Sequence, residues 1–224
     1  MIHLLQDKVQ KTKTECSMIH SVKCILLGST GVGKSSLLLK YVDNDFISDL
    51  QATLGVDYKT KTVFISETEY KLNLWDTAGQ ERFKSIVRSY YNYVNCVFFC
   101  FSLVDHKSFV ELQNIIDDFD RTVAPIVKDN CSRILVGTFY DKSFDMHVGD
   151  AEINRFIKKN DIHSYHNVSS KTGINVNELF NTAIERTVYI YNKKGLQFKE
   201  TPKLELDIEP SNNNTFNSDC CTII

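Results

Sequence analysis

The feature that most constrains this chain is the loop at residues 28–35, which spells Gly-Ser-Thr-Gly-Val-Gly-Lys-Ser and fits the pattern GxxxxGK[ST]. A short apolar run at residues 22–27 precedes the loop, and a helical pattern at residues 34–42 follows it. Glycines let backbone amides turn toward phosphate oxygens, and the N-terminus of a helix adds positive potential. Because the strand and helix supply the context that this motif needs, the pattern predicts a phosphate-binding loop.

Two side chains of this loop add chemistry that the backbone cannot supply. We expect Lys34 to reach the terminal phosphates of a nucleotide and the hydroxyl of Ser35 to ligate Mg²⁺. An ordinary glycine-rich turn is the alternative interpretation. The predicted nucleotide-binding residues in this part of the chain are Gly28, Thr30, Gly31, Val32, Gly33, Lys34, Ser35 and Ser36.

Strand and helix patterns alternate along the rest of the chain. Apolar runs at residues 97–101 and 134–136 are typical of buried parallel strands. Adjacent strand patterns at residues 58–65 and 72–76 indicate a hairpin that turns at residues 67–69. Alternation of this kind predicts a wound, mostly parallel sheet. Further helices are expected at residues 108–121, 150–159 and 175–191, and a further strand at residues 163–168.

Length and composition predict one domain with tails. The chain has 224 residues, of which 42% are hydrophobic and 24% charged, and this is enough for one α/β core. We expect an N-terminal extension at residues 1–18 and a domain at residues 19–192. Residues 193–224 include two prolines and an Asn-rich stretch with little apolar periodicity, so we expect a flexible tail there.

Charge and cysteine usage exclude several classes of protein. The net charge of -2 supplies no global basic field, so nucleic acid is not an expected partner. Seven cysteines without a CxxC pair, in a chain with no apolar signal segment, indicate a reducing, cytosolic setting. No apolar run approaches the roughly 20 residues that span a bilayer. Any membrane contact must therefore come from added lipid.

A second motif identifies a family. Residues 75–83 spell Trp-Asp-Thr-Ala-Gly-Gln-Glu-Arg-Phe and contain the pattern DxxGQ, in which an acid at a strand end precedes a flexible loop. This run and the segment Thr-Leu-Gly-Val-Asp-Tyr at residues 53–58 resemble segments of the Rab branch of the Ras superfamily. The resemblance covers about residues 21–191. It implies an α/β Ras-like P-loop GTPase domain, with a mostly parallel six-stranded sheet and helices on both faces.

The resemblance also assigns roles to residues around the phosphates. Thr53 would ligate Mg²⁺ and touch the γ-phosphate, Asp76 would hold the metal through water, and the Gly79 amide would sense the γ-phosphate. A solvated loop threonine is the alternative for Thr53, but its spacing from Ser35 fits the family. Intrinsic hydrolysis should be slow, because no arginine is obviously placed to stabilise the transition state. The implied metal ligands are Ser35, Thr53 and Asp76, and the implied catalytic residues are Gln80, which orients water, and Lys34.

The base-reading loop departs from the family. An Asn-Lys-x-Asp segment reads guanine in the family, whereas the aligned residues here are Thr138, Phe139, Tyr140 and Asp141. Asp141 can still accept hydrogen bonds from the guanine ring N–H and exocyclic amine, which adenine does not present. Loss of the Asn removes a tie to the phosphate loop, and loss of the Lys removes a stem that covers the base. We therefore expect weakened nucleotide affinity.

Aromatic residues could compensate in part. Phe139 could lie on one face of guanine while Phe46 packs on the other; an ordinary core residue is the alternative interpretation of Phe139. The family also has a second base loop, Ser-Ala-Lys, whose middle amide contacts the guanine oxygen. The matching residues here are Ser169, Ser170 and Lys171.

Two further features concern partners and membranes. Tyr58, Trp75 and Tyr90 fall where Rab proteins carry an aromatic triad that reports nucleotide state to effectors, although half-buried sheet aromatics are an alternative. Cys220 and Cys221 near the C-terminus resemble prenylation cysteines. The acidic tail offers no attraction to anionic lipid, and one prenyl chain anchors only marginally, so we favour two geranylgeranyl groups.

These observations favour a monomeric GTP/GDP switch that uses Mg²⁺, hydrolyses GTP slowly and recruits effectors to membranes in vesicle trafficking. The implied partners are an exchange factor, a GTPase-activating protein, effectors and a prenyl-binding chaperone. The expected location is the cytoplasm, with cycling to the cytosolic face of an intracellular or plasma membrane. The altered base loop leaves two alternatives open: a weakly or non-hydrolysing scaffold, and a septation-type Ras-like GTPase, whose loop also has the form Thr-x-Tyr-Asp.

Overall fold

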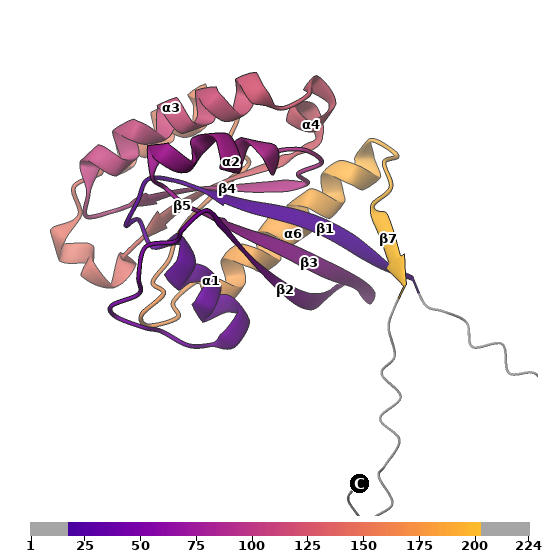
Figure 1. The fold of residues 1–224 in the computed structure, drawn as a ribbon, viewed down its shortest axis with the longest axis horizontal. Helices are drawn as coiled ribbons and strands as arrows, with labels where there is room; N and C mark the ends of the chain where they lie inside the picture. The colour runs from indigo at the N-terminus through magenta and orange to yellow at the C-terminus, as the bar shows by residue number, and fades with distance from the viewer. Residues whose placement is uncertain (1–17, 203–224) are drawn as a thin grey trace, which may run out of the picture.

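The computed structural model describes residues 18–202 and contains one central sheet with helices on both faces (Figure 1). Within that range the sheet has seven strands in the order β2-β3-β1-β4-β5-β6, and β7 pairs with β1. The β2–β3 and β1–β7 pairs are antiparallel, and the other pairs are parallel. The strands are β1 (Met18–Leu27), β2 (Val56–Ile65), β3 (Thr68–Thr77), β4 (Cys96–Ser102), β5 (Ser132–Thr138), β6 (Ser164–Asn167) and β7 (Lys199–Pro202).

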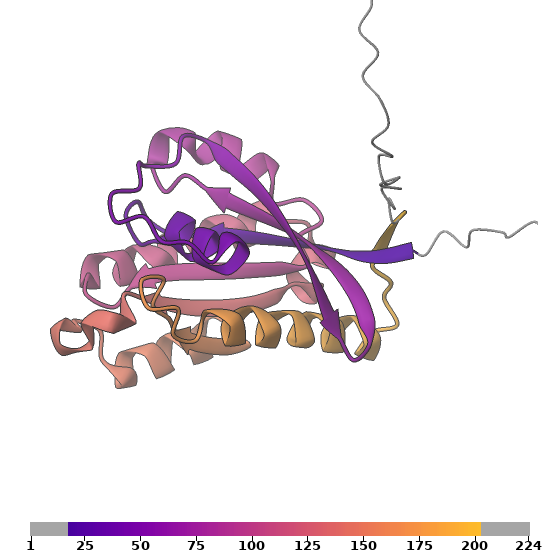
Figure 2. The ribbon, with the colours of Figure 1, turned by 90° about the horizontal axis from the view of Figure 1, so that it is seen from below.

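Helices cover the two faces of the sheet separately. Helices α1 and α6 pack on one face, and α2, α3 and α5 pack on the other, as the two views show (Figures 1 and 2). No helix within residues 18–202 is long and apolar enough to cross a membrane. The helices are α1 (Lys34–Asp43), α2 (Lys84–Ser89), α3 (His106–Thr122), α4 (Pro125–Asn130), α5 (Asp150–Lys159) and α6 (Val176–Lys193), with short 3₁₀ turns η1 (Glu81–Phe83) and η2 (Tyr140–Asp145).

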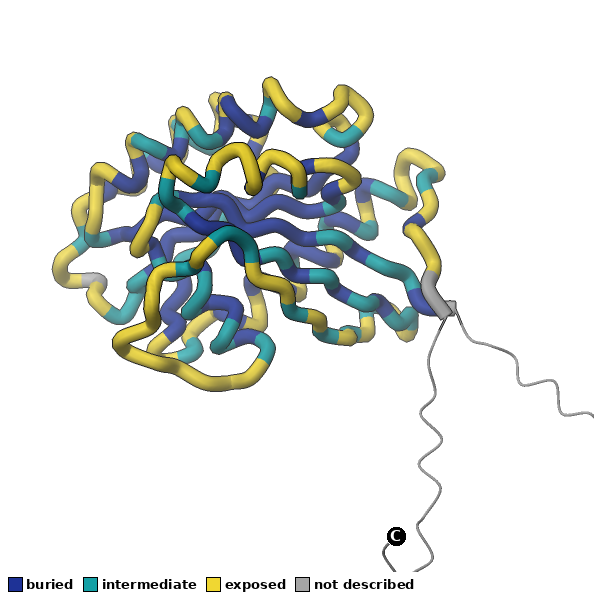
Figure 3. The backbone as a smooth tube through the Cα atoms, in the orientation of Figure 1, coloured by how far each residue is buried: buried dark blue, intermediate teal, exposed yellow. Residues whose placement is uncertain are grey.

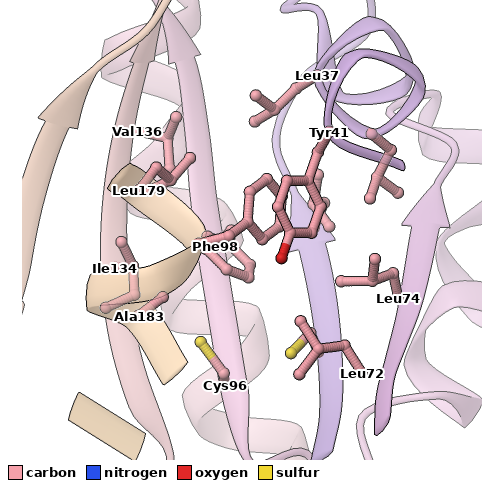
Figure 4. Close-up of a cluster of buried hydrophobic side chains, with 14 of the residues drawn as sticks. Leu37, Tyr41, Leu72, Leu74, Cys96, Phe98, Ile134, Val136, Leu179 and Ala183 are labelled. Carbon is pink, nitrogen blue, oxygen red and sulfur yellow. The ribbon is translucent and has the colours of Figure 1, made fainter. Parts of the chain in front are cut away.

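The central strands are apolar on both sides because both sides are covered. Every residue of β4 is buried, and the buried strands run through the middle of the molecule (Figure 3). Phe98 faces the cluster that includes Tyr41 and Leu179 (Figure 4), whereas Phe99 faces the cluster of α3. Burying each such side chain contributes about 1.5–3 kcal/mol. The core therefore fixes the strand ends on which the loops depend.

The hairpin between β2 and β3 differs slightly from the prediction. The turn consists of Ser66 and Glu67, one residue earlier than expected, since Ile65 already pairs with Thr68. Both turn residues have positive φ, 47° and 65°, as a two-residue hairpin turn of type I′ requires. Neither residue is glycine or asparagine, so the sequence carried no strong turn signal at this point.

The predicted tail also needs correction, because the domain extends past residue 193. The strand β7 pairs with Met18–Ser21 at the start of β1, and this adds a seventh strand to the predicted six. Phe198, just before β7, is buried between α6 and the sheet, with its ring stacked on Tyr191 at 4.2 Å between centroids and edge-on to Tyr70 at 5.6 Å. The predicted prenylation cysteines Cys220 and Cys221 lie outside the described residues.

Candidate nucleotide-binding site

The loops that follow β1, β3, β5 and β6, together with the loop between α1 and β2, enclose a cavity of about 420 Å³ at the carboxyl ends of these parallel strands. Ligands commonly bind at this edge of an α/β sheet. The predicted residues that line the cavity are Thr30, Gly31, Gly33, Lys34, Ser35, Ser36, Phe46, Thr53, Gly79, Gln80, Thr138, Phe139, Asp141, Ser170 and Lys171. The predicted residues Gly28, Val32, Asp76 and Ser169 are not among those that line it.

The phosphate-binding loop has the conformation that its glycines predict. Gly31 and Gly33 have φ of 79° and 86°, where other residues are strained. A side chain on Gly28 would begin 2.2 Å from the carbonyl oxygen of Cys100. Helix α1 begins at Lys34 without a side-chain N-cap hydrogen bond. Its first amides therefore have no side-chain acceptor and can bind an anion.

The side chain of Lys34 is buried against the phosphate-binding loop. Its ammonium donates hydrogen bonds to the carbonyl oxygens of Gly28 at 2.7 Å and Ser29 at 2.9 Å. Burial lowers the pKa of Lys34, and the nearby Asp76 carboxylate opposes that effect. The ammonium is thus held at the phosphate loop, where a negatively charged ligand would compensate its desolvation.

The loop after β3 touches the phosphate loop directly. A side chain on Gly79 would begin 2.3 Å from the backbone nitrogen of Thr30 and 2.4 Å from the carbonyl carbon of Ser29. Only glycine allows this approach. The backbone of Gly79 and the following Gln80 therefore lie beside the position predicted for the terminal phosphate.

The three predicted metal ligands meet at one point. Ser35 and Thr53 hydroxyl oxygens lie 2.6 Å apart, Thr53 donates to Asp76 Oδ2 at 3.1 Å, and Ser35 donates to the same oxygen. Asp76 Oδ1 is buried and has no hydrogen-bond partner among residues 18–202. Burial raises the pKa of the Asp76 carboxyl despite hydrogen bonds from Ser35 and Thr53 and the charge of Lys34. An all-oxygen set with an unpartnered carboxylate oxygen fits Mg²⁺.

Thr138 overturns one sequence-based expectation. Its hydroxyl oxygen lies 2.7 Å from the Val32 carbonyl oxygen and 2.9 Å from that of Phe101. The tie between the base loop and the phosphate loop is therefore retained, since the threonine hydroxyl reaches the loop although the family's Asn is missing. The prediction that this tie is lost was wrong.

Phe139 is a partly exposed residue of the cavity wall and not an ordinary core residue. It has φ of 61°, a left-handed conformation that is costly for an aromatic residue. This conformation brings its ring within 3.6 Å of the position that a side chain on Gly33 would occupy. Phe46 lines the same cavity and is 36% exposed. Both rings are therefore available to a ligand in the cavity.

The second base loop, residues 169–171, holds the aspartate of the first, residues 138–141. Ser169 is fully buried and donates to Asp141 Oδ1 at 2.7 Å, which fixes the carboxylate. Sequence reasoning missed Lys142, which lines the cavity and places its ammonium 5.6 Å from the centre of the Phe139 ring. Its position next to Asp141 was the one available signal. The other lining residues that sequence reasoning missed are Ile47, Ser48, Leu50, Gln51, Ala52 and Thr77.

The predicted aromatic triad is contiguous. Ring centroids of Tyr58 and Trp75 are 4.6 Å apart, and those of Trp75 and Tyr90 are 4.8 Å apart. Tyr58 is 45% exposed, whereas Trp75 and Tyr90 are half-buried. The two interpretations of these residues are therefore compatible: the rings pack on the sheet and still present an aromatic surface.

Comparisons with known proteins agree with this geometry. The model of the Ras family matches residues 23–189. Ras-related protein Rab-2B of Dictyostelium discoideum is 33% identical over 167 residues, which are 75% of this chain and 80% of that protein. Ypt/Rab-type GTPase ypt7 of Schizosaccharomyces pombe is 32% identical over 191 residues, 85% of this chain and 93% of that protein. Ras-related protein Rab-13 of Rattus norvegicus is 33% identical over 167 residues, which are 73% of this chain and 78% of that protein. This chain belongs to the Ras family and is a Rab-like small GTPase.

Proposed function

We propose that this protein is a Rab-type switch that binds GTP or GDP with Mg²⁺ in the cavity, hydrolyses GTP slowly and recruits effectors to membranes in vesicle trafficking. The observation that carries the proposal is the convergence of Ser35, Thr53 and Asp76, from three separate segments of the chain, next to the buried Lys34. Such an arrangement suits a ligand that combines phosphate with a divalent cation.

The phosphates would be held by the chain's own cation and backbone. Lys34 and the first amides of α1 would bind the triphosphate, while the Ser35 and Thr53 hydroxyls and the Asp76 carboxylate would hold Mg²⁺, directly or through water. Mg²⁺, when bound, neutralises charge on the phosphate oxygens. The backbone of Gly79, which lies against Thr30, would respond to the γ-phosphate.

Hydrolysis would depend on Gln80, which lines the cavity directly after Gly79 and would orient the attacking water. No arginine is among the described residues that line the cavity. The transition-state charge would therefore be only partly compensated until a GTPase-activating protein contributes a cation. Intrinsic turnover would therefore be slow, and regulators could control the switch.

Guanine would be read by Asp141, oriented by Ser169, and by the backbone of Ser170 with Lys171 beside it. Phe139 would cover one face of the base in place of the family's lysine stem, and Phe46 would cover the other face. Because Thr138 retains the tie to the phosphate loop, we favour a binding-competent switch over a scaffold that has lost nucleotide.

Partners and location follow from the same proposal. Tyr58, Trp75 and Tyr90 would contact effectors, and an exchange factor and a prenyl-binding chaperone would complete the cycle between cytosol and membrane. Cys220 and Cys221 would carry two geranylgeranyl groups. Mass spectrometry of the tail from expressing cells tests this point, since an unmodified Cys220 would contradict two lipids.

Calorimetry with GTP, GDP and ATP in the presence of Mg²⁺ tests the proposed function. We expect binding of both guanine nucleotides, weak or no binding of ATP, and a large loss of affinity in Lys34→Ala. Single-turnover assays should give slow GTP hydrolysis that Gln80→Leu abolishes. Failure of the purified protein to bind guanine nucleotide would refute the proposal, and binding without any hydrolysis would favour the scaffold alternative.

A further inference from the structure

Helix α2 is attached to α3 through one buried carboxylate. Asp118 on α3 is only 3% exposed. The Arg88 guanidinium on α2 contacts both of its oxygens, with Nε donating to Oδ2 at 3.1 Å and Nη2 donating to Oδ1. The Lys84 ammonium, also on α2, lies 3.3 Å from Oδ1. Among the described residues, the ion-pair partners of Asp118 therefore all lie on the short helix α2.

This attachment is asymmetric, because the cations are half-exposed and the carboxylate is buried. Burial would raise the pKa of Asp118, but the hydrogen bonds from Arg88 and the charge of Lys84 outweigh it and hold that pKa below its ordinary value. If α2 moved away, Asp118 would lose both cations that compensate its charge, whereas Lys84 and Arg88, already half-exposed, could be solvated by water. The ion pairs with Asp118 therefore favour the docked position of α2.

The attached helix continues directly from the catalytic loop. Residues 79–89, here called the switch segment, contain Gly79 against the phosphate loop, Gln80 at the cavity, then η1 and α2. Lys84 caps η1 with a backbone hydrogen bond to Glu81, so the two turns are continuous. Only the three residues of η1 separate Gln80 from Lys84, so the position of α2 restricts where Gln80 can lie.

We propose that Asp118 is a positioning residue for GTP hydrolysis, which holds the switch segment through Lys84 and Arg88 so that Gln80 stays at the phosphate end of the cavity. The inference rests on the proposed role of Gln80 and extends it to a residue that does not line the cavity. It also means that α3 contributes to the rate of hydrolysis without contact with nucleotide.

Asp118→Asn tests the proposal, because it keeps the size of the side chain and removes its charge. We expect the single-turnover rate of GTP hydrolysis to fall about tenfold, as for a displaced catalytic group, while the rate of GDP dissociation stays within about twofold. Arg88→Ala should reproduce the effect, and the double variant should lose no more than the single ones. Asp117→Asn, one residue earlier on the exposed side of α3, is the matched control and should behave as wild type.

The ratio of the hydrolysis rate to the GDP dissociation rate distinguishes a specific effect on the position of Gln80 from a general loss of rigidity, because a less rigid domain would release GDP faster. Wild-type hydrolysis in both Asp118→Asn and Arg88→Ala would overturn the inference, provided that Gln80→Leu is inactive. If Gln80→Leu hydrolyses GTP normally, the proposed role of Gln80 fails instead. Should Asp118→Asn not fold, Arg88→Ala decides the question, since Arg88 lies on the surface and is half-exposed.

Discussion

Thr138 retains a contact that the sequence suggested was lost, and its hydroxyl is a point where the site can be tested. Thr138→Val keeps the shape of the side chain but leaves the Val32 and Phe101 carbonyl oxygens without this donor. Loss of a buried hydrogen bond of this kind costs about 1 kcal/mol. We expect GDP to dissociate about five times faster, as measured with a fluorescent nucleotide.

The matched control for Thr138 is Thr187→Val. Thr187 is fully buried and bonds the carbonyl oxygen of Ala183, but it lies within α6 and not among the residues of the cavity. Its loss should lower the stability of the domain slightly and leave nucleotide dissociation unchanged. Equal effects in both variants would show that the Thr138 hydroxyl acts through overall stability and not through the phosphate loop.

Phe139 carries a second prediction at this level. Phe139→Ala removes a ring that lines the cavity beside Gly33. Stacking of a base on an aromatic ring contributes about 1–3 kcal/mol, so we expect guanine nucleotide to dissociate at least about fivefold faster. Stopped-flow measurement with labelled GDP checks this, with the fully exposed Phe144→Ala as control. Unchanged dissociation in Phe139→Ala would rule out stacking on the base.

Individual residues of the site could be predicted where the conformation or close approach of the backbone allows only one residue type. Gly28 and Lys34 were predicted from a loop that must approach phosphate closely; the structure leaves no room for a side chain on Gly28 and has the Lys34 ammonium bonded to the Gly28 carbonyl oxygen. The tie made by Thr138 and the position of Lys142 were not predictable, because each depends on the distance between loops that are far apart in the sequence. Spacing along the chain carries no information on such distances.

Among the elements, β7 is the least expected, and it leads to a prediction about stability. Phe198 precedes β7 and packs between α6 and the sheet. Phe198→Ala would leave a cavity there, and we expect a loss of about 2–4 kcal/mol in the free energy of unfolding, because the site is at the edge of the core. Urea unfolding measures this quantity. Nucleotide dissociation should not change, since β7 pairs with the start of β1 (Figure 1) and the cavity lies beyond the end of that strand.

The comparison variant for Phe198 is Phe64→Ala, which removes a ring that is 68% exposed on β2 and should cost less than about 1 kcal/mol. A similar loss in both variants would mean that β7 adds nothing to the fold.

Long elements such as α3 and α6 were predictable because their apolar residues recur with a helical period. The short α2 and α4, and β7 with its partner 180 residues away in the chain, lack such a period.

The stability of the molecule as a whole should depend on pH through His163. Its Nδ1 accepts a hydrogen bond from the Arg133 amide at 2.9 Å, so this nitrogen must be unprotonated. Burial, followed by the positive charges of Arg186 and Arg133, lowers the pKa of His163 in the folded protein. The unfolded chain then binds a proton at higher pH than the folded chain does. The contribution of His163 to the free energy of unfolding is therefore fully present above about pH 6.5 and is lost progressively as the pH falls below that value.

Urea unfolding at pH 7.5 and pH 5.5, with GDP and Mg²⁺ fixed at saturation, measures this dependence. We expect a lower free energy of unfolding at pH 5.5 and a smaller difference between the two pH values in His163→Gln. That variant cannot gain a charge in this range, and its amide oxygen can still accept a hydrogen bond. His166, whose pKa burial also lowers, contributes to the remaining dependence. An identical pH dependence in wild type and His163→Gln would show that the Arg133–His163 contact does not couple protonation to folding.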